Sequence, residues 1–115
     1  MHSAAPDEMK HIPTSRWEAW CDTFANGNRG RLIRIELDEE LGGEPLVAGA
    51  KLVAIDYDPP GKGNALTISF GPDEAPTRHT INNPVALRQD QDVNGLVVSI
   101  RVEDAEGGVT MVRFD

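Results

Sequence analysis

The chain has 115 residues, 19 acidic and 11 basic, so its formal net charge is −8. This length matches one domain that can bury a core without cross-links. The negative charge repels nucleic-acid phosphates and anionic lipid headgroups, which argues against nucleic-acid and membrane-surface partners.

Cys21 is the only cysteine, so the chain can form neither an internal disulfide nor a multi-cysteine zinc site. The N-terminus has no apolar signal core, and no stretch approaches the ~20 apolar residues that span a bilayer. These features predict a cytoplasmic protein without a cofactor. Residues 1–11 are polar and aperiodic, which predicts a flexible tail before a single globular domain over 12–115.

The first predicted element is a helix over residues 16–25. Ser15 and Glu18 have the spacing of a capping box, and Asn26-Gly27 is typical of a left-handed helix end. Four residues at helical spacing form an apolar stripe: Trp17, Trp20, Cys21 and Phe24. So short a helix is marginal alone, so we expect the stripe to pack on a sheet.

Alternating apolar residues predict the strands that follow. Residues 32–37 form the first strand, and 38–43 an acidic turn. Residues 52–70 read as a β-hairpin whose Pro- and Gly-rich loop, 58–64, cannot continue a ladder. The first arm is apolar on both faces, which indicates cover on both sides, a bend or a bulge. Residues 77–82 predict a short strand with His79 and Ile81 on one face.

The last third of the chain predicts a closing hairpin. Asn83-Pro84 ends the preceding strand, Val85 and Leu87 add one short extended piece, and residues 88–95 read as a polar loop. A turn at 104–108 separates the two arms. The side chains expected to share a face or point inward are Leu96, Val98, Ile100 and Val102 on one arm, and Val112 and Phe114 on the other.

One helix followed by about six strands with short links implies antiparallel neighbours. We therefore expect an α+β fold, with one N-terminal helix packed on a strongly bent antiparallel sheet or partly closed barrel of about six strands. An Sm-like or SH3-like roll is one such arrangement. Two stacked sheets with a helix at the side is the alternative.

Several short motifs, in order over residues 12–115, resemble those of a small bacterial family catalogued only as a domain of unknown function. They are Ile12-Pro13, Trp17 with Phe24, Gly30, Ile33-Arg34-Ile35-Glu36, Tyr57-Asp58-Pro59, His79-Thr80-Ile81 before Pro84, and Val112-Arg113-Phe114. Trp20-Cys21 stands where similar chains have a pair of aromatics. The resemblance implies one compact domain and carries no activity, substrate or cofactor.

His79 is the first candidate for chemistry, as a general base or ligand with Asp56 or Asp58 near the 58–64 loop. A histidine hydrogen-bonded to a loop carbonyl is the more common use of such a residue. A Cys21–His79 nucleophile and base is disfavoured, because a thiol on the apolar helix stripe packs in the core and is inert. Asp56-Tyr57-Asp58 lacks the Gly and Glu of a calcium loop, so no metal is expected.

Arg29, Arg31 and Arg34 form the one basic cluster. Arg29 and Arg31 could hold an anionic group, whereas a solvated strand edge is the commoner role of such charges. A nucleic-acid-binding roll would need the three arginines to converge with an exposed aromatic ring.

No catalytic constellation stands out, and a small sheet offers exposed edges that invite pairing. We therefore expect a non-enzymatic domain that binds another protein or assembles with itself. The alternative is a small-ligand binder or enzyme that uses His79 with Asp56 or Asp58.

Overall fold

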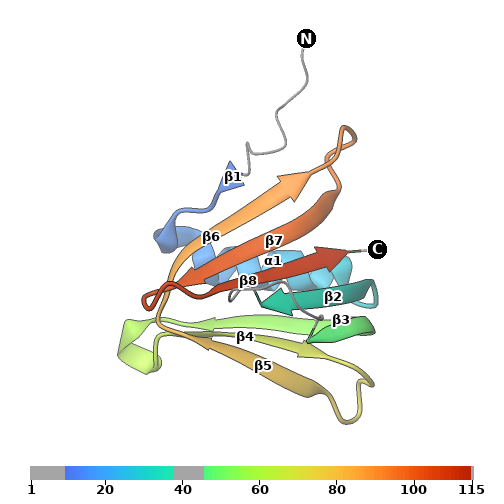
Figure 1. The fold of residues 1–115 in the computed structure, drawn as a ribbon, viewed down its shortest axis with the longest axis horizontal. Coiled ribbons are helices and arrows are strands. Elements are labelled where there is room, and N and C mark those ends of the chain that lie inside the picture. Colours follow the sequence, from blue (N-terminus) through green and yellow to red (C-terminus); the bar gives the residue numbers. More distant parts are fainter. Residues whose placement is uncertain (1–9, 38–45, 115) are drawn as a thin grey trace.

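The computed structural model describes residues 10–37 and 46–114. One helix, α1 (Trp17–Asn28), lies behind a single antiparallel sheet in Figure 1. The strands are β1 (Lys10–His11), β2 (Leu32–Leu37), β3 (Val47–Asp58), β4 (Ala65–Phe70), β5 (Thr77–Asn82), β6 (Pro84–Gln91), β7 (Val97–Asp104) and β8 (Val109–Phe114). The expected α+β class, with one helix on an antiparallel sheet, is confirmed.

The sheet differs from the expectation in strand number and closure. Its order is β1-β6-β7-β8-β2-β3-β4-β5, with β1 and β5 at the two edges. The eight strands of the described residues form an open sheet, so the expected closure into a barrel and the expected number of about six strands are wrong. Lys10 and His11, which the sequence analysis placed in the tail, form β1 and pair with Gln89 and Arg88 of β6.

Strand β6 is longer than the short extended piece expected at Val85 and Leu87, because Arg88–Gln91 reads as polar loop in the sequence. These residues pair with β7, and β1 covers part of their other edge. Arg88 lies 3.8 Å from Glu103, and the amide oxygen of Gln89 accepts a hydrogen bond from Trp20 Nε1 at 3.2 Å. Arg88 and Gln89 of this strand therefore contact partners that are distant in sequence.

Helix α1 begins and ends later than the sequence predicts. Ser15 lies in a preceding 3-10 turn, η1 (Thr14–Arg16), and no side chain caps the start of α1, so the predicted capping box is wrong. The helix also continues past Gly27 to Asn28. The residue with a positive φ after the helix is Gly30, at 93°.

The apolar stripe of α1 packs into the core as predicted. Trp17, Cys21 and Phe24 are buried, while Trp20 is partly buried at the border of the core. The Trp17 ring meets Tyr57 of β3 edge to face at 5.1 Å, and Phe24 meets Phe114 of β8 in the same way at 5.4 Å. These two contacts fix the helix across the sheet.

The hairpin of β3 and β4 is confirmed, and a bulge explains why its first arm is apolar on both faces. Leu52 pairs with Phe70 but Ala54 pairs with Ser69, so the ladder skips Val53. Leu52 and Ile55 consequently both reach the core, with only 1% and 3% of their surface exposed. The loop after β3 contains one 3-10 turn, η2 (Pro60–Lys62).

Strand β7 departs from strict alternation in a similar way. Asp90 pairs with Ser99 and Gln91 with Val97, so the ladder skips Val98. Val97 is buried instead, and Leu96 lies before the strand and is 49% exposed. The predicted common face therefore holds for Ile100 and Val102 but not for Leu96 and Val98. Val112 and Phe114 of β8 are buried as expected, and the predicted turn at 38–43 lies outside the described residues.

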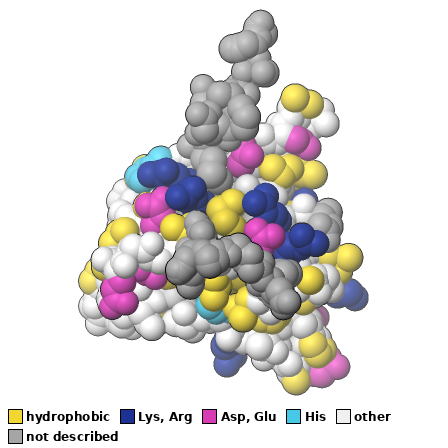
Figure 2. All heavy atoms as spheres, viewed as in Figure 1, with side chains coloured by type: hydrophobic (Ala, Val, Ile, Leu, Met, Phe, Trp, Pro, Cys, Tyr) yellow, Lys and Arg dark blue, Asp and Glu magenta, His cyan; other side chains and the backbone are white. Residues whose placement is uncertain are grey.

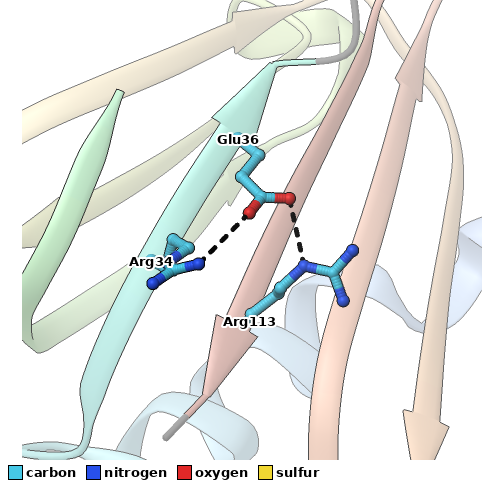
Figure 3. A network of polar contacts seen from close by, with 3 residues as sticks. All are labelled: Arg34, Glu36 and Arg113. Carbon is cyan, nitrogen blue, oxygen red and sulfur yellow. Dashed lines mark hydrogen bonds and ion pairs between the residues drawn. The ribbon is translucent and has the colours of Figure 1, made fainter. Parts of the chain in front are cut away.

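Basic and acidic side chains are interspersed on the outer face of the sheet, the face that points away from α1 (Figure 2). In Figure 3, Glu36 of β2 lies between two arginines, with 3.0 Å to Arg113 Nε and 3.8 Å to Arg34 Nη1. All three side chains are substantially exposed, so the pairs contribute little to stability. The network pairs opposite charges on the adjacent strands β2 and β8.

Candidate functional site

A pocket of about 320 Å³ lies beside strand β5. Its walls include five consecutive residues, His79 to Asn83, and no residue of β4 contributes. The pocket therefore adjoins the edge of β5 that points away from β4. The opposite wall comes from Leu37 at the end of β2 and from the turn between β7 and β8. A volume of about 300 Å³ or more is enough for a side chain or a small ligand.

Asn83 connects the end of β5 to the loop before β4 and to the β7–β8 turn, at one end of this pocket. Its backbone N–H donates to the carbonyl of Asn64 at 2.9 Å, and its own carbonyl accepts from Ala105 N–H at 2.9 Å. Asn83 adopts a positive φ of 54°, a conformation that asparagine tolerates better than most residues. The junction thus fixes β5 relative to the β7–β8 turn.

Asp104 organises the turn that forms the far wall. Its Oδ1 accepts hydrogen bonds from the backbone N–H groups of Glu106 and Gly108, each at 2.9 Å. A Cβ at Gly108 would lie 2.7 Å from Oδ2 of Asp104, so a larger residue here would have to displace the Asp104 carboxylate. Asp104 and Glu106 give the pocket a negative wall that the sequence analysis treated only as a turn. In the sequence, Asp104 with the Gly107-Gly108 pair was the signal for this turn.

His79 lines the same pocket and is half-buried. It lies opposite Ile68 in the β4–β5 ladder, so its side chain is on the inner face that carries the core. Burial lowers its pKa from the ordinary value of 6.5. None of the hydrogen bonds or ion pairs between described residues uses its imidazole ring. His79 is thus accessible from the pocket and favours the neutral form.

The structure does not bring Asp56 or Asp58 to His79. Asp56 pairs with Thr67 and Asp58 with Ala65, so both point to the face opposite His79. The predicted histidine–carboxylate pair is therefore absent. The acidic residues that share the pocket with His79 are Asp104 and Glu106.

The three arginines of the basic cluster also have separate surroundings. Arg29 lies 3.6 Å from Asp73, and both side chains are exposed. Arg31 donates from Nη1 to Asn28 Oδ1 and to the Val97 carbonyl, each at 2.9 Å, and its guanidinium lies 4.7 Å from the centre of the Phe114 ring. Arg34 belongs to the outer-face network. Arg31 thus binds the helix end to β7 and β8, and the three do not form one anion site.

Cys21 belongs to the core and not to a site. Its side chain is buried, and desolvation, with smaller contributions from Asp56 and Asp22, raises the pKa of its thiol to about 12. The thiol is therefore protonated at physiological pH, as expected from its place on the helix stripe. Among residues 10–37 and 46–114, no three His, Cys, Asp or Glu side chains are grouped so that they could hold a metal ion.

Comparison with known proteins identifies a family but no function. Within the described part of the chain, no helix has the length and apolarity needed to cross a bilayer. Searches of curated proteins and of solved structures found no match. The sequence profile of DUF5335, described as a family of unknown function, matches residues 8–115. The chain belongs to this family, in agreement with the resemblance that its motifs indicated.

Proposed function

We propose that this domain is a non-enzymatic protein-binding module that accepts an extended segment of a partner along β5. The observation that carries the proposal is the position of β5: it ends the sheet, runs for six residues, and pairs on its outer side with no strand of the described residues. An edge strand of this kind offers unpaired backbone groups to an added strand.

The two edges of the sheet differ in a way that favours β5. The β6 side is covered in part by β1 and by the hydrogen bond from Ile12 N–H to the Leu87 carbonyl at 2.8 Å. Strand β5 carries one formal charge, Arg78, and no proline. Proteins commonly protect exposed edges with charged residues, proline or bulges, and Arg78 is the one such feature of β5.

The pocket beside β5 would supply specificity. Main-chain hydrogen bonds give an added strand affinity, and side-chain pockets select its sequence. Asp104 and Glu106 make this pocket negative, so a partner with a lysine or arginine near the strand would be complementary. A second copy of the chain would bring another net charge of −8. We therefore favour a basic segment of another protein as the occupant.

A displayed library of extended peptides, screened against the purified domain, tests this proposal. We expect enrichment of sequences with at least one lysine or arginine. A selected peptide should lose binding when alternate backbone nitrogens are methylated, because methylation removes strand hydrogen bonds and keeps the side chains. Failure to enrich any peptide, or equal affinity after methylation at either set of alternate positions, would overturn the proposal.

Two charge-reversal variants refine the test. Glu106→Lys should weaken the selected peptide about tenfold, the size of effect expected for a charged contact. Glu18→Lys makes the same charge change on the exposed side of α1 and should leave the affinity unchanged. Equal losses in both variants would mean that net charge alone drives binding. Sedimentation showing a stable dimer lost in Thr80→Lys would replace the partner by a second copy and contradict our choice of occupant.

A further inference from the structure

A second hollow, of about 560 Å³, lies between β1, the first turns of the helical segment and β6. We refer to it as the α1 groove. Its lining includes Lys10, Ile12, Arg16, Ala19, Trp20, Thr23 and Gln89. It lies beside β1, at the edge of the sheet opposite to β5 in the strand order. The proposed partner site at β5 therefore does not account for it.

One face of the helical segment forms a wall of the α1 groove. Arg16, Ala19, Trp20 and Thr23 are spaced i, i+3, i+4 and i+7, so they lie along one side. Ala19 is exposed and small, which leaves room between the larger residues above and below it. Trp20 stacks on Phe24 at 4.9 Å and stays partly exposed.

Gln89 is the most informative residue of the groove. Only 8% of its surface is exposed, and its Oε1 accepts the hydrogen bond from Trp20 Nε1. An indole N–H can only donate, so the amide oxygen must face it and the NH₂ group must point elsewhere. No hydrogen bond between described residues uses this NH₂ group. No described side-chain nitrogen is both fully buried and unpartnered, so this NH₂ group reaches solvent, and Gln89 lines the groove.

Among the described residues that line the groove, the charged side chains are Lys10 and Arg16, which are both basic. Lys10 lies opposite Gln89 in the β1–β6 pair, which places the two side chains on the same face. Arg16 lines the groove from the helical side. Neither cation pairs with a carboxylate among the described residues, and no described Asp or Glu lines the groove. Such a local excess of donors is unusual in a chain with a net charge of −8.

We propose that the α1 groove binds a small organic anion, with a phosphate or carboxylate group attached to a flat apolar body. The anionic group would accept hydrogen bonds from the Gln89 NH₂ and from Lys10 and Arg16. The apolar body would lie against Ile12 and the exposed part of Trp20. Donors, cations and an aromatic surface thus meet in this groove.

Phenyl phosphate is a suitable probe, because it combines both parts of the proposed ligand. The two indole N–H signals in a proton–nitrogen NMR spectrum give an internal comparison. The Trp20 signal should move on titration, whereas Trp17, whose N–H is buried against the Ile12 carbonyl at 2.7 Å, should move much less. Phosphate alone should bind more weakly, and phenol should cause no saturable change.

Three variants and one control variant complete the test. Gln89→Glu keeps the shape and the acceptor for Trp20 but removes the donors, and Ala19→Leu fills an exposed part of the groove without touching the core. Lys51→Glu changes the same charge as Lys10→Glu at an exposed site on β3 and serves as the control. We expect Gln89→Glu, Ala19→Leu and Lys10→Glu each to weaken phenyl phosphate about tenfold or more, and Lys51→Glu to have no such effect.

Either of two results would overturn the proposal. One is the absence of any saturable Trp20 shift at millimolar phenyl phosphate in the wild-type protein. The other is unchanged affinity in folded Ala19→Leu and Gln89→Glu proteins, with folding checked by thermal melting. Neither result depends on peptide binding at β5, so the two proposals fail separately.

Discussion

The indole nitrogen of Trp17 donates a hydrogen bond to the carbonyl of Ile12 at 2.7 Å, inside the core. Ile12 directly follows β1, and its own N–H donates to the Leu87 carbonyl of β6. Trp17 also meets Tyr57 of β3. One side chain therefore connects the helix to both halves of the sheet.

Truncation of this side chain should be strongly destabilising. Trp17→Ala and Phe24→Ala each leave a large cavity, so each should reduce the free energy of unfolding by about 3–5 kcal/mol. Trp20→Ala should cost clearly less, because Trp20 is only partly buried. Urea denaturation measures all three. A loss under about 1 kcal/mol for Trp17→Ala would mean that the helix does not depend on this contact.

Arg31→Lys should also reduce stability, by about 1–2 kcal/mol, since lysine cannot reproduce two directed hydrogen bonds and the contact with the Phe114 ring. Arg34→Lys is the matched control: its ion pair with Glu36 is exposed and long at 3.8 Å, so the change should stay within about 0.5 kcal/mol. Similar values for both variants, from parallel denaturant melts, would contradict this role of Arg31.

The raised pKa of the Cys21 thiol predicts that the protein loses stability at alkaline pH. Its folded-state pKa of about 12 lies above the ordinary 9.0, so the unfolded chain releases this proton first. The contribution to stability is complete below pH 9.0 and declines between pH 9.0 and about 12. The free energy of unfolding of wild type should therefore fall more steeply above pH 9.0 than that of Cys21→Ala. The slope for one proton is roughly 1 kcal/mol per pH unit. Parallel slopes would show that the thiol ionises equally in both states.

The lowered pKa of His79 predicts that the protein also loses stability at acidic pH. Its folded-state pKa is lowered from 6.5 by burial, so the unfolded chain takes up the proton first as pH falls. Stability is complete above pH 6.5 and is lost as pH falls through the lowered folded-state value. Proton NMR should give a His79 titration midpoint below 6.5, with the signal assigned by its absence in His79→Gln. A midpoint at or above 6.5 would place the ring in open solvent or beside a carboxylate.

The sequence predicted those parts of the fold that depend on local pattern. The apolar stripe from Trp17 to Phe24 and the β3–β4 hairpin are regular enough for periodicity to reveal them. Only the first half of β6 could be predicted, because Gln89 in its second half is buried against Trp20, a residue 69 positions away. The helix end was misplaced because Gly27 and Gly30 carry equivalent local signals, and tertiary packing decides between them.

The candidate site was only half predictable for the same reason. His79 was selected from the sequence and does line a pocket. Its predicted partners, Asp56 and Asp58, face away because the β3–β4–β5 register places them on the other side of the sheet. A register cannot be read from one strand alone. The carboxylates that do share the pocket, Asp104 and Glu106, come from a turn brought there by Asn83.

The most direct test of the proposed module is to find which backbone amides a selected peptide affects. Amide proton–nitrogen spectra, recorded with and without the peptide, report every non-proline residue. We predict that the largest shifts and the new protection from hydrogen exchange fall on β5, with further shifts at residues 104–108. Changes concentrated on any other strand, with β5 amides exchanging as in the free protein, would contradict binding by strand addition at this edge.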